Sequence, residues 1–404
     1  MTHPSGSERV RLASANEPQL GKFRVLAIDG GGIRGVIPAV LLADLEALLN
    51  RTLASVRGDP AQASTAALWD GISEPRIADC FHLIAGASTG GLLAAGLTNA
   101  GSDHRPKLSA ADAVNVYRSH GQEIFHRSLL RSLLNPLNLL RPKYPLAQLR
   151  KVLEIQTVLG AGRLEDARTG VLIASYDLSV PGPRLFTRWG APGAGTTPAA
   201  PEETMVQAGL ATAAAPTYFD PEKLGPSRLV DGGIYAGNPA LAAISMALRR
   251  TEEPWPVDPS EILLISLGTG AWEQPLDPGW GGIIGWLRPR KGGEPLLEAL
   301  LGGQGDFATE AAHMILNGWS ETSLPGTDAA APAGPWWDPN LPPASVGGGP
   351  RFWRYQAALP DPWALDDVSK LSQLTDIATA MTERYRSELE RLAVLLVRAG
   401  PVPG

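Results

Sequence analysis

Residues 81–100 read FHLIAGASTGGLLAAGLTNA, and this stretch decides the class of fold. FHLIAGAS (81–88) is mostly apolar and typical of a buried β-strand, and the small residues that follow begin a helical pattern. Residues 23–50 repeat the plan: FRVLAID predicts a strand, three glycines follow, and VIPAVLLADLEALLN is apolar at helical spacing. Pro38 falls in the first turn of that helix, where its missing N–H costs little. The chain therefore contains two strand–glycine–helix units.

Further strands and helices are expected to alternate toward the C-terminus. Strands are predicted at 170–179, 184–189 and 261–268, and helices at 205–215, 239–250 and, as one long element, 371–399. Apolar strands that alternate with helices indicate an α/β fold with a mostly parallel sheet covered on both faces. We expect a flexible N-terminal tail at 1–20, a single domain over 21–400 and a Pro/Gly-rich loop at 324–350, either functional or mobile.

The composition excludes several classes of protein. A formal net charge of −6 gives no electrostatic support for binding a nucleic-acid polymer. The single cysteine, Cys80, rules out an intrachain disulfide and a cysteine-based zinc cluster, and the histidines lack metal-ligand spacing. The sequence has no signal-peptide core and no run of roughly 18 apolar residues. We expect a cytoplasmic protein without metal or cofactor, whose contact with a membrane is peripheral.

Residues Gly86-Ala87-Ser88-Thr89-Gly90 match the pattern G-x-S-x-G at the expected strand-to-helix junction. A sharp turn here projects the Ser88 hydroxyl out of the sheet edge, and Gly86 and Gly90 let the backbone turn without clashes. The start of the following helix adds a positive dipole and free N–H groups. Two interpretations stay open, because the pattern fits a nucleophile and also a simple tight turn.

Three consecutive glycines, Gly30, Gly31 and Gly32, follow the first expected strand. In an acyl hydrolase their N–H groups would hold the oxyanion of the tetrahedral intermediate. Arg34 offers a cation that either contacts a phosphate head group or braces the loop. With Gly35, the stretch also fits the dinucleotide fingerprint G-x-G-x-x-G, but that motif requires an acid-ended second strand about 20 positions on, where the pattern is helical. A nucleotide-binding signalling module is therefore a weaker alternative.

A third loop begins at Asp231, which follows an apolar approach and precedes Gly232 and Gly233. If its carboxylate lies within about 3 Å of the Ser88 hydroxyl, it can take the serine proton. A simpler interpretation is that Asp231 caps a turn formed by the two glycines. Considered alone, the loop favours the turn.

Histidine usage separates two mechanisms. A Ser–His–Asp esterase of the α/β-hydrolase type needs a histidine after the acid, and only His313 follows Asp231. His313 lies in an amphipathic helical pattern, where a lone histidine is more often structural than catalytic. A Ser88–Asp231 pair is the simpler assignment, and an esterase that uses His313 stays as the alternative.

Together, these loops and their flanks resemble the patatin-like phospholipase family, and its plant-patatin-like members in particular. The resemblance rests on DGGGIRG (29–35), GASTGG (86–91), AGLATAAAPTYFDP (208–221), LVDGGIYAGNPA (229–240), ILLISLGTG (262–270) and WRYQAALPDPWALDDVSK (353–370). Order, context and flanks all match, over roughly residues 21–395. The combination is therefore specific, although each short pattern is weak.

The resemblance implies a three-layer α/β/α sandwich that hydrolyses fatty-acyl esters of phospholipids or other acyl lipids without a metal. By position, it implies that Ser88 is the nucleophile, Asp231 its base, and the N–H groups around Gly30–Gly32 the oxyanion hole, with Arg34 beside it. One departure is Gly237, where many members have asparagine. Some bacterial relatives are effectors switched on by cyclic nucleotides, and the sequence offers no support for such an activator here.

Two segments are candidates for contact with a lipid interface. LLRSLLNPLNLLRPKYPL (129–146) is apolar with basic interruptions and fits a lid or an interfacial helix. GWGGIIGWLRPRKGG (279–293) joins two tryptophans to a basic run. Packing in the core is the favoured explanation of both segments, so they predict peripheral contact with a membrane at most.

Overall fold

The structure is a computed structural model that describes residues 23–125, 142–189, 202–249, 258–272, 285–286, 295–317 and 351–403. The expected tail at 1–20 and the Pro/Gly-rich loop at 324–350 lie outside the described residues, as do most of 129–146 and 279–293. Among the helices that are described, none is both long enough and apolar enough to cross a bilayer.

One mixed sheet organises these residues. Its strands are β1 Phe23–Ile28, β2 Leu83–Ala87, β3 Gly170–Asp177, β4 Gly182–Thr187, β5 Glu222–Leu224, β6 Ser227–Asp231, β7 Ile262–Leu267 and β8 Phe352–Tyr355. They form an eight-stranded sheet in the order β5-β6-β3-β2-β1-β7-β8, with β4 paired to β3. The strands from β3 to β8 in this order run parallel, whereas β4 and β6 are antiparallel to β3, and β5 to β6. The expectation of a mostly parallel sheet is confirmed.

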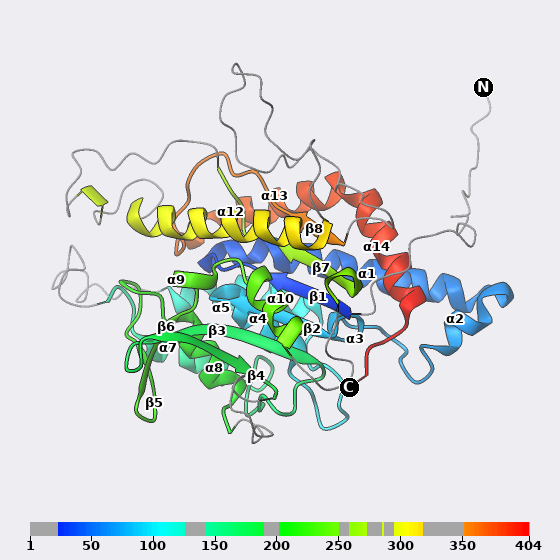
Figure 1. Ribbon diagram of the computed structural model, residues 1–404, viewed down its shortest axis with the longest axis horizontal. Coiled ribbons are helices and arrows are strands. Elements are labelled where there is room, and N and C mark those ends of the chain that lie inside the picture. Colours follow the sequence, from blue (N-terminus) through cyan, green and yellow to red (C-terminus); the bar gives the residue numbers. More distant parts are fainter. Residues whose placement is uncertain are drawn as a thin grey trace, which may run out of the picture.

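Helices cover both faces of the sheet (Figure 1). One side carries α1 Val36–Arg57, α4 Thr89–Thr98, α5 Ala110–Ile124, α7 Leu146–Leu153, α8 Met205–Ala213, α13 Leu371–Arg384 and α14 Arg386–Ala399. The other side carries α9 Gly233–Ala236, α10 Ala240–Arg249 and α12 Pro295–Asn317. The short helices α2 Ala63–Ala67 and α3 Ile77–Cys80 follow α1. The result is the expected three-layer α/β/α sandwich.

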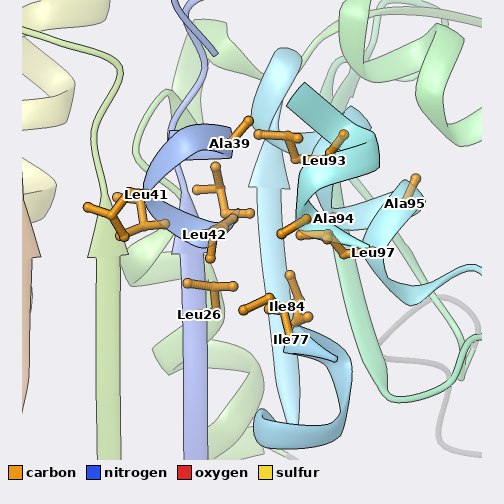
Figure 2. Close-up of a cluster of buried hydrophobic side chains, with 14 of the residues drawn as sticks. Leu26, Ala39, Leu41, Leu42, Ile77, Ile84, Leu93, Ala94, Ala95 and Leu97 are labelled. Atoms are coloured by element: carbon orange, nitrogen blue, oxygen red, sulfur yellow. The ribbon is translucent and has the colours of Figure 1, made fainter. Parts of the chain in front are cut away.

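Successive side chains of the central strands enter different cores, one on each face of the sheet. Leu26 belongs to the core beneath α1, and its neighbour Val25 to the core beneath α10. Figure 2 shows Leu26 and Ile84 of the sheet in one cluster with Leu42 of α1 and Leu93 of α4. Because both faces are buried, these strands are apolar at most positions, which explains the long apolar runs in the sequence.

The C-terminal region differs from expectation in one respect. The periodic stretch 371–399 forms two helices, α13 and α14, because the chain leaves the helical path at Tyr385 (φ −97°, ψ 19°). The Tyr385 ring packs edge-on against Tyr355 of β8, with 5.1 Å between ring centroids. Both helices bury a face against α1, so the apolar spacing continues through a break that periodicity alone does not reveal.

The sheet register brings three loops to one edge. Ile28, the last residue of β1, pairs with Gly86 of β2 and with Leu267 of β7, so the loops after these parallel strands lie side by side. Ala87 pairs with Ala174, and the next residue of β3, Ser175, pairs with Asp231 at the end of the antiparallel β6. Asp231 therefore lies level with the residue that follows β2, which is Ser88.

Candidate active site

Ser88 occupies a strained turn between β2 and α4. Its φ of 54° and ψ of −128° lie in a region that residues with a side chain rarely adopt. Gly86 and Gly90 permit the turn: a Cβ on Gly86 would lie 2.1 Å from the Gly90 carbonyl oxygen, and one on Gly90 would lie 2.1 Å from that of Ile28. The Ser88 N–H donates to Oγ1 of Thr212 at 2.9 Å. These contacts hold the conformation that the G-x-S-x-G pattern predicts.

Asp231 lies next to this turn and is only 4% exposed. The Ser88 hydroxyl lies close enough to its carboxylate to lower its pKa, and the Gly233 N–H donates to Oδ1 at 2.7 Å. Burial raises the pKa of Asp231 to about 7, although its interactions with Ser88 and Gly233 lower it. Gly232 lets the loop approach β3, because a Cβ there would lie 2.3 Å from the Ala174 carbonyl. Asp231 thus caps a turn and also contacts Ser88.

The glycine loop lies directly against Ser88, since a Cβ on Gly30 would be 3.1 Å from that of Ser88. The Gly30 N–H donates to the Gly237 carbonyl at 2.9 Å, so it is not available to an oxyanion, contrary to expectation. Within the described part of the chain, the N–H groups of Gly31 and Gly32 donate to no protein acceptor. The available donors of the loop are therefore these two.

Close packing fixes the path of the loop. The Thr269 hydroxyl donates to the Gly30 carbonyl at 2.7 Å, and a Cβ on Gly31 would lie only 2.3 Å from the same hydroxyl oxygen. Gly32 has a φ of +57°, and a Cβ there would lie 2.1 Å from the Leu365 carbonyl oxygen. Larger residues at Gly31 or Gly32 would displace the backbone and with it the two N–H groups.

Arg34 braces this loop. It is 4% exposed, its Nε donates to the Gly31 carbonyl at 3.4 Å, and its guanidinium lies 5.2 Å from the ring centroid of Trp272. Nη2 is 3.6 Å from Oε2 of Glu298 on α12. Of the two roles considered for Arg34, the structure therefore favours bracing over contact with a phosphate head group.

A buried ion pair holds the start of the loop, and sequence reasoning missed its partner. Asp29 makes a two-pronged contact with Arg354 of β8, at 2.9 Å and 2.5 Å, and Arg354 also donates to the Ser266 hydroxyl at 2.7 Å. Burial raises the pKa of Asp29, and the Arg354 guanidinium counteracts this shift. The sequence did contain a signal for Arg354, because it is a charged residue inside the apolar run FWRY. A buried charge needs a partner of opposite charge.

An apolar cavity of about 110 Å³ opens beside Ser88. It follows α4 from Ser88 past Leu92 to Gly96, a distance of about 12 Å at the rise of a helix. Its far end is lined by Leu108 and Val158. The cavity is narrow and hydrophobic, so it suits a hydrocarbon chain whose reactive end reaches the Ser88 hydroxyl.

The two alternatives to a Ser–Asp pair find little support in the geometry. His313 packs edge-on against Phe352, with 6.3 Å between ring centroids. The pairing of β8 with β7, of β7 with β1 and of β1 with β2 places Phe352 at the same level of the sheet as Leu83. Leu83 precedes Ser88 by five residues, roughly 16 Å along a strand, so His313 is far from the serine. Residues 36–57 form α1, where a dinucleotide site would need a second strand.

Comparisons with known proteins agree with these features. A family model described as patatin-like phospholipase matches residues 26–244. Patatin-like protein 1 of Oryza sativa subsp. indica is 32% identical over 313 residues, which cover 71% of this chain and 69% of the relative. Patatin-07 of Solanum tuberosum is 35% identical over 268 residues, or 61% of this chain and 60% of the relative.

Two further similarities are less informative about activity. A relative named probable inactive patatin-3-Kuras 1, also from Solanum tuberosum, is 34% identical over 291 residues, covering 66% of this chain and 68% of its own. The crystal structure of VipD from Legionella pneumophila matches 92% of this chain and 68% of its own, at 12% identity and a TM-score of 0.27.

Proposed function

The chain belongs to the patatin-like phospholipase family, and from this premise we propose that it is a lipid acyl hydrolase with Ser88 as nucleophile and Asp231 as general base. The observation that carries the proposal is the position of Ser88, which occupies a strained turn beside the buried Asp231 carboxylate and lowers the pKa of that carboxylate. The adjoining loop carries two N–H groups, those of Gly31 and Gly32, that donate to no acceptor among the described residues.

The reaction has two steps, and Asp231 carries the proton in both. In the first, the Ser88 Oγ attacks the ester carbonyl while Asp231 takes its proton, and the N–H groups of Gly31 and Gly32 stabilise the oxyanion. The intermediate collapses, the proton passes to the leaving alcohol or lysolipid, and an acyl-enzyme remains. In the second step, Asp231 takes a proton from water, which attacks the acyl-enzyme. The new tetrahedral intermediate collapses, the bond from the acyl carbon to Ser88 Oγ breaks, and the proton passes from Asp231 to Oγ as the fatty acid leaves.

The environment of Asp231 makes a carboxylate suitable as a base. An ordinary aspartate, with a pKa near 3.8, holds its proton too weakly for efficient transfer near neutrality. Burial brings the pKa of Asp231 to about 7, where the ionised form is still populated and its proton affinity is much higher. No metal or other cofactor is part of the proposed mechanism.

The apolar cavity supports a fatty-acyl ester as the substrate. The acyl chain lies along α4 with its carbonyl at Ser88, and the polar head group stays outside the cavity. The substrate is a phospholipid or another acyl lipid, reached through peripheral contact with a membrane. A cyclic-nucleotide activator has no support among the described residues and enters only as a condition of the assay.

The test is release of free fatty acid, read by mass spectrometry, from phospholipid vesicles and from a soluble acyl ester. Wild type should release it, whereas Ser88→Ala and Asp231→Asn should not. The matched controls are Ser372→Ala and Asp376→Asn, two exposed positions on α13 that should behave as wild type. Release by Ser88→Ala would reject the assigned nucleophile.

If the wild type releases no fatty acid, a second set of assays is needed, because one relative is named as probably inactive. The assay is then repeated with cyclic nucleotides, and binding of nucleotides is followed by thermal shift. Activity that appears only with a nucleotide supports a switched hydrolase. Nucleotide binding without any hydrolysis would instead favour the signalling module.

A further inference from the structure

Helix α12 lies outside the segment that matches the family model, yet it contacts the loop that carries Asp231 (Figure 1). The side-chain amide of Gln304 joins the two ends of α9. Its Nε2 donates to the Gly233 carbonyl at 2.6 Å, and its Oε1 accepts from the Gly237 N–H at 2.9 Å. In an uninterrupted α-helix, that N–H and that carbonyl would bond to each other. Gln304 is thus inserted into the backbone ladder at the end of α9.

The two backbone groups that Gln304 holds belong to residues that position both halves of the site. Gly233 donates its N–H to Oδ1 of Asp231 at 2.7 Å. Gly237 accepts, through its carbonyl, the Gly30 N–H at 2.9 Å. One contact of Gln304 therefore leads to the proposed base, and the other leads to the loop with the proposed oxyanion donors.

These loops need an external support because their own residues provide little. Gly233 and Gly237 have no side chains, and glycine loses more backbone freedom on ordering than any other residue. A Cβ at position 237 would lie 3.6 Å from Cδ of Gln304, an ordinary van der Waals distance, so the amide packs directly against this residue. A second contact from α12 lies beside it, where Nδ2 of Asn238 is 3.0 Å from the Thr309 hydroxyl.

We propose that Gln304 is a positioning residue that holds the Asp231 loop and the glycine loop in register with each other. It touches neither substrate nor reacting atoms, and it acts through Gly233 and Gly237. The inference rests on the proposed function for its kinetic meaning, but the positioning itself is measurable without any reaction.

The experiment compares wild type with Gln304→Met, which keeps the length of the side chain and removes both hydrogen bonds. Gln304→Asn, one methylene shorter, keeps the amide but does not reach both backbone groups. Both variants should lower kcat about 10- to 100-fold while KM changes little, because the reacting groups are misplaced and the acyl cavity is intact. The matched control is Gln373→Met, at an exposed position on α13, which should keep wild-type kinetics.

Two further readouts separate this inference from the proposed function. Hydrogen exchange of the Gly237 and Gly30 amides should accelerate in both Gln304 variants, whether or not the protein hydrolyses lipid. Labelling of Ser88 by a fluorophosphonate probe, read by intact mass, should slow in parallel. If the wild type hydrolyses no lipid either with or without cyclic nucleotides but these two effects appear, the positioning role stands and the proposed function fails. Wild-type kcat, labelling and exchange in both variants would overturn the inference.

Discussion

At the scale of single residues, Asp231 combines two demands that oppose each other. A general base must be ionised, but a carboxylate that is 4% exposed loses most of its hydration when it carries charge. Among the described residues, the Ser88 hydroxyl and the Gly233 N–H offset part of that loss, and the pKa remains raised at about 7. The strength of the base and the instability of its charged form therefore have one cause.

A first prediction concerns the pH dependence of turnover. Because the ionised carboxylate is the active form, kcat/KM for an uncharged acyl ester should rise with pH and reach half its plateau near pH 7. The profile should fall about tenfold for each pH unit well below that value. Stopped assays between pH 5 and 9 in buffers of constant ionic strength would measure it. A profile that stays flat down to pH 5 would mean that Asp231 ionises with an ordinary pKa and is not limiting.

The residues of the site differ in how far the sequence could predict them. Ser88, Asp231 and Gly30–Gly32 stand in loops whose patterns are weak one by one, and it was their combination and order along the chain that selected them. The satisfied Gly30 N–H was not predictable, because its acceptor at Gly237 lies 207 positions away. Arg354 gave one local signal, a charge within an apolar strand.

At the scale of elements, α4 has two roles. Its first turn follows Ser88, and its next turns form one wall of the apolar cavity as far as Gly96. The helix therefore sets both the position of the nucleophile and the depth available to a chain that reaches it. A Cβ on Gly96 would lie 3.1 Å from Cδ1 of Leu108, which shows how closely the far end of the cavity is packed.

A second prediction follows from that depth. Gly96→Leu should fill the far end of the cavity and shorten the acyl chains that the protein accepts. Hydrolysis of short-chain esters should stay within about threefold of wild type, whereas hydrolysis of long-chain esters should fall at least about tenfold. The measurement is kcat/KM over a series of soluble esters of increasing chain length. The short esters serve as the internal control for folding, and an equal loss at all lengths would contradict the assignment of the cavity.

Helices and strands could be predicted from the sequence where burial alone determines their pattern of apolar residues. The strands β1, β2, β3 and β7 are apolar runs covered on both faces, and their sequences show it. β5 and β8 have three and four residues, too few for a periodic signal. The break between α13 and α14 was missed because both helices pack on α1, so their apolar spacing is continuous. Gln304 has no local signal at all, since its role depends on which loop α12 covers.

At the scale of the whole molecule, the site is a meeting of segments that are distant in the chain. The carboxyl ends of parallel strands supply the glycine loop and Ser88, the antiparallel β6 supplies Asp231, and α12 and β8 add Gln304 and Arg354. The sheet register explains why these loops meet, since it fixes the level at which each strand ends. Because the convergence buries the Asp231 carboxylate, the stability of the fold depends on whether that carboxylate is charged.

A third prediction concerns that dependence. The folded-state pKa of Asp231 is about 7, above the ordinary value of 3.8. Between these pH values the folded state keeps a proton that the unfolded state loses, so Asp231 makes folding less favourable as pH rises from about 4 to about 7. Asp231→Asn removes this titration, and all other titrating groups are common to both proteins. Relative to wild type, the variant should therefore gain up to about 4 kcal/mol of unfolding free energy between pH 4 and pH 8.

Urea denaturation of wild type and Asp231→Asn at pH 4 and pH 8 measures this difference, with Asp376→Asn as the exposed control that should show no such gain. The sign of this difference in unfolding free energy is informative by itself. If the carboxylate were held mainly by its hydrogen bonds, its folded pKa would fall below the ordinary value and the variant would lose stability at pH 8. A gain at pH 8 that coincides with lost turnover would instead show that the same buried charge lowers stability and supplies the base.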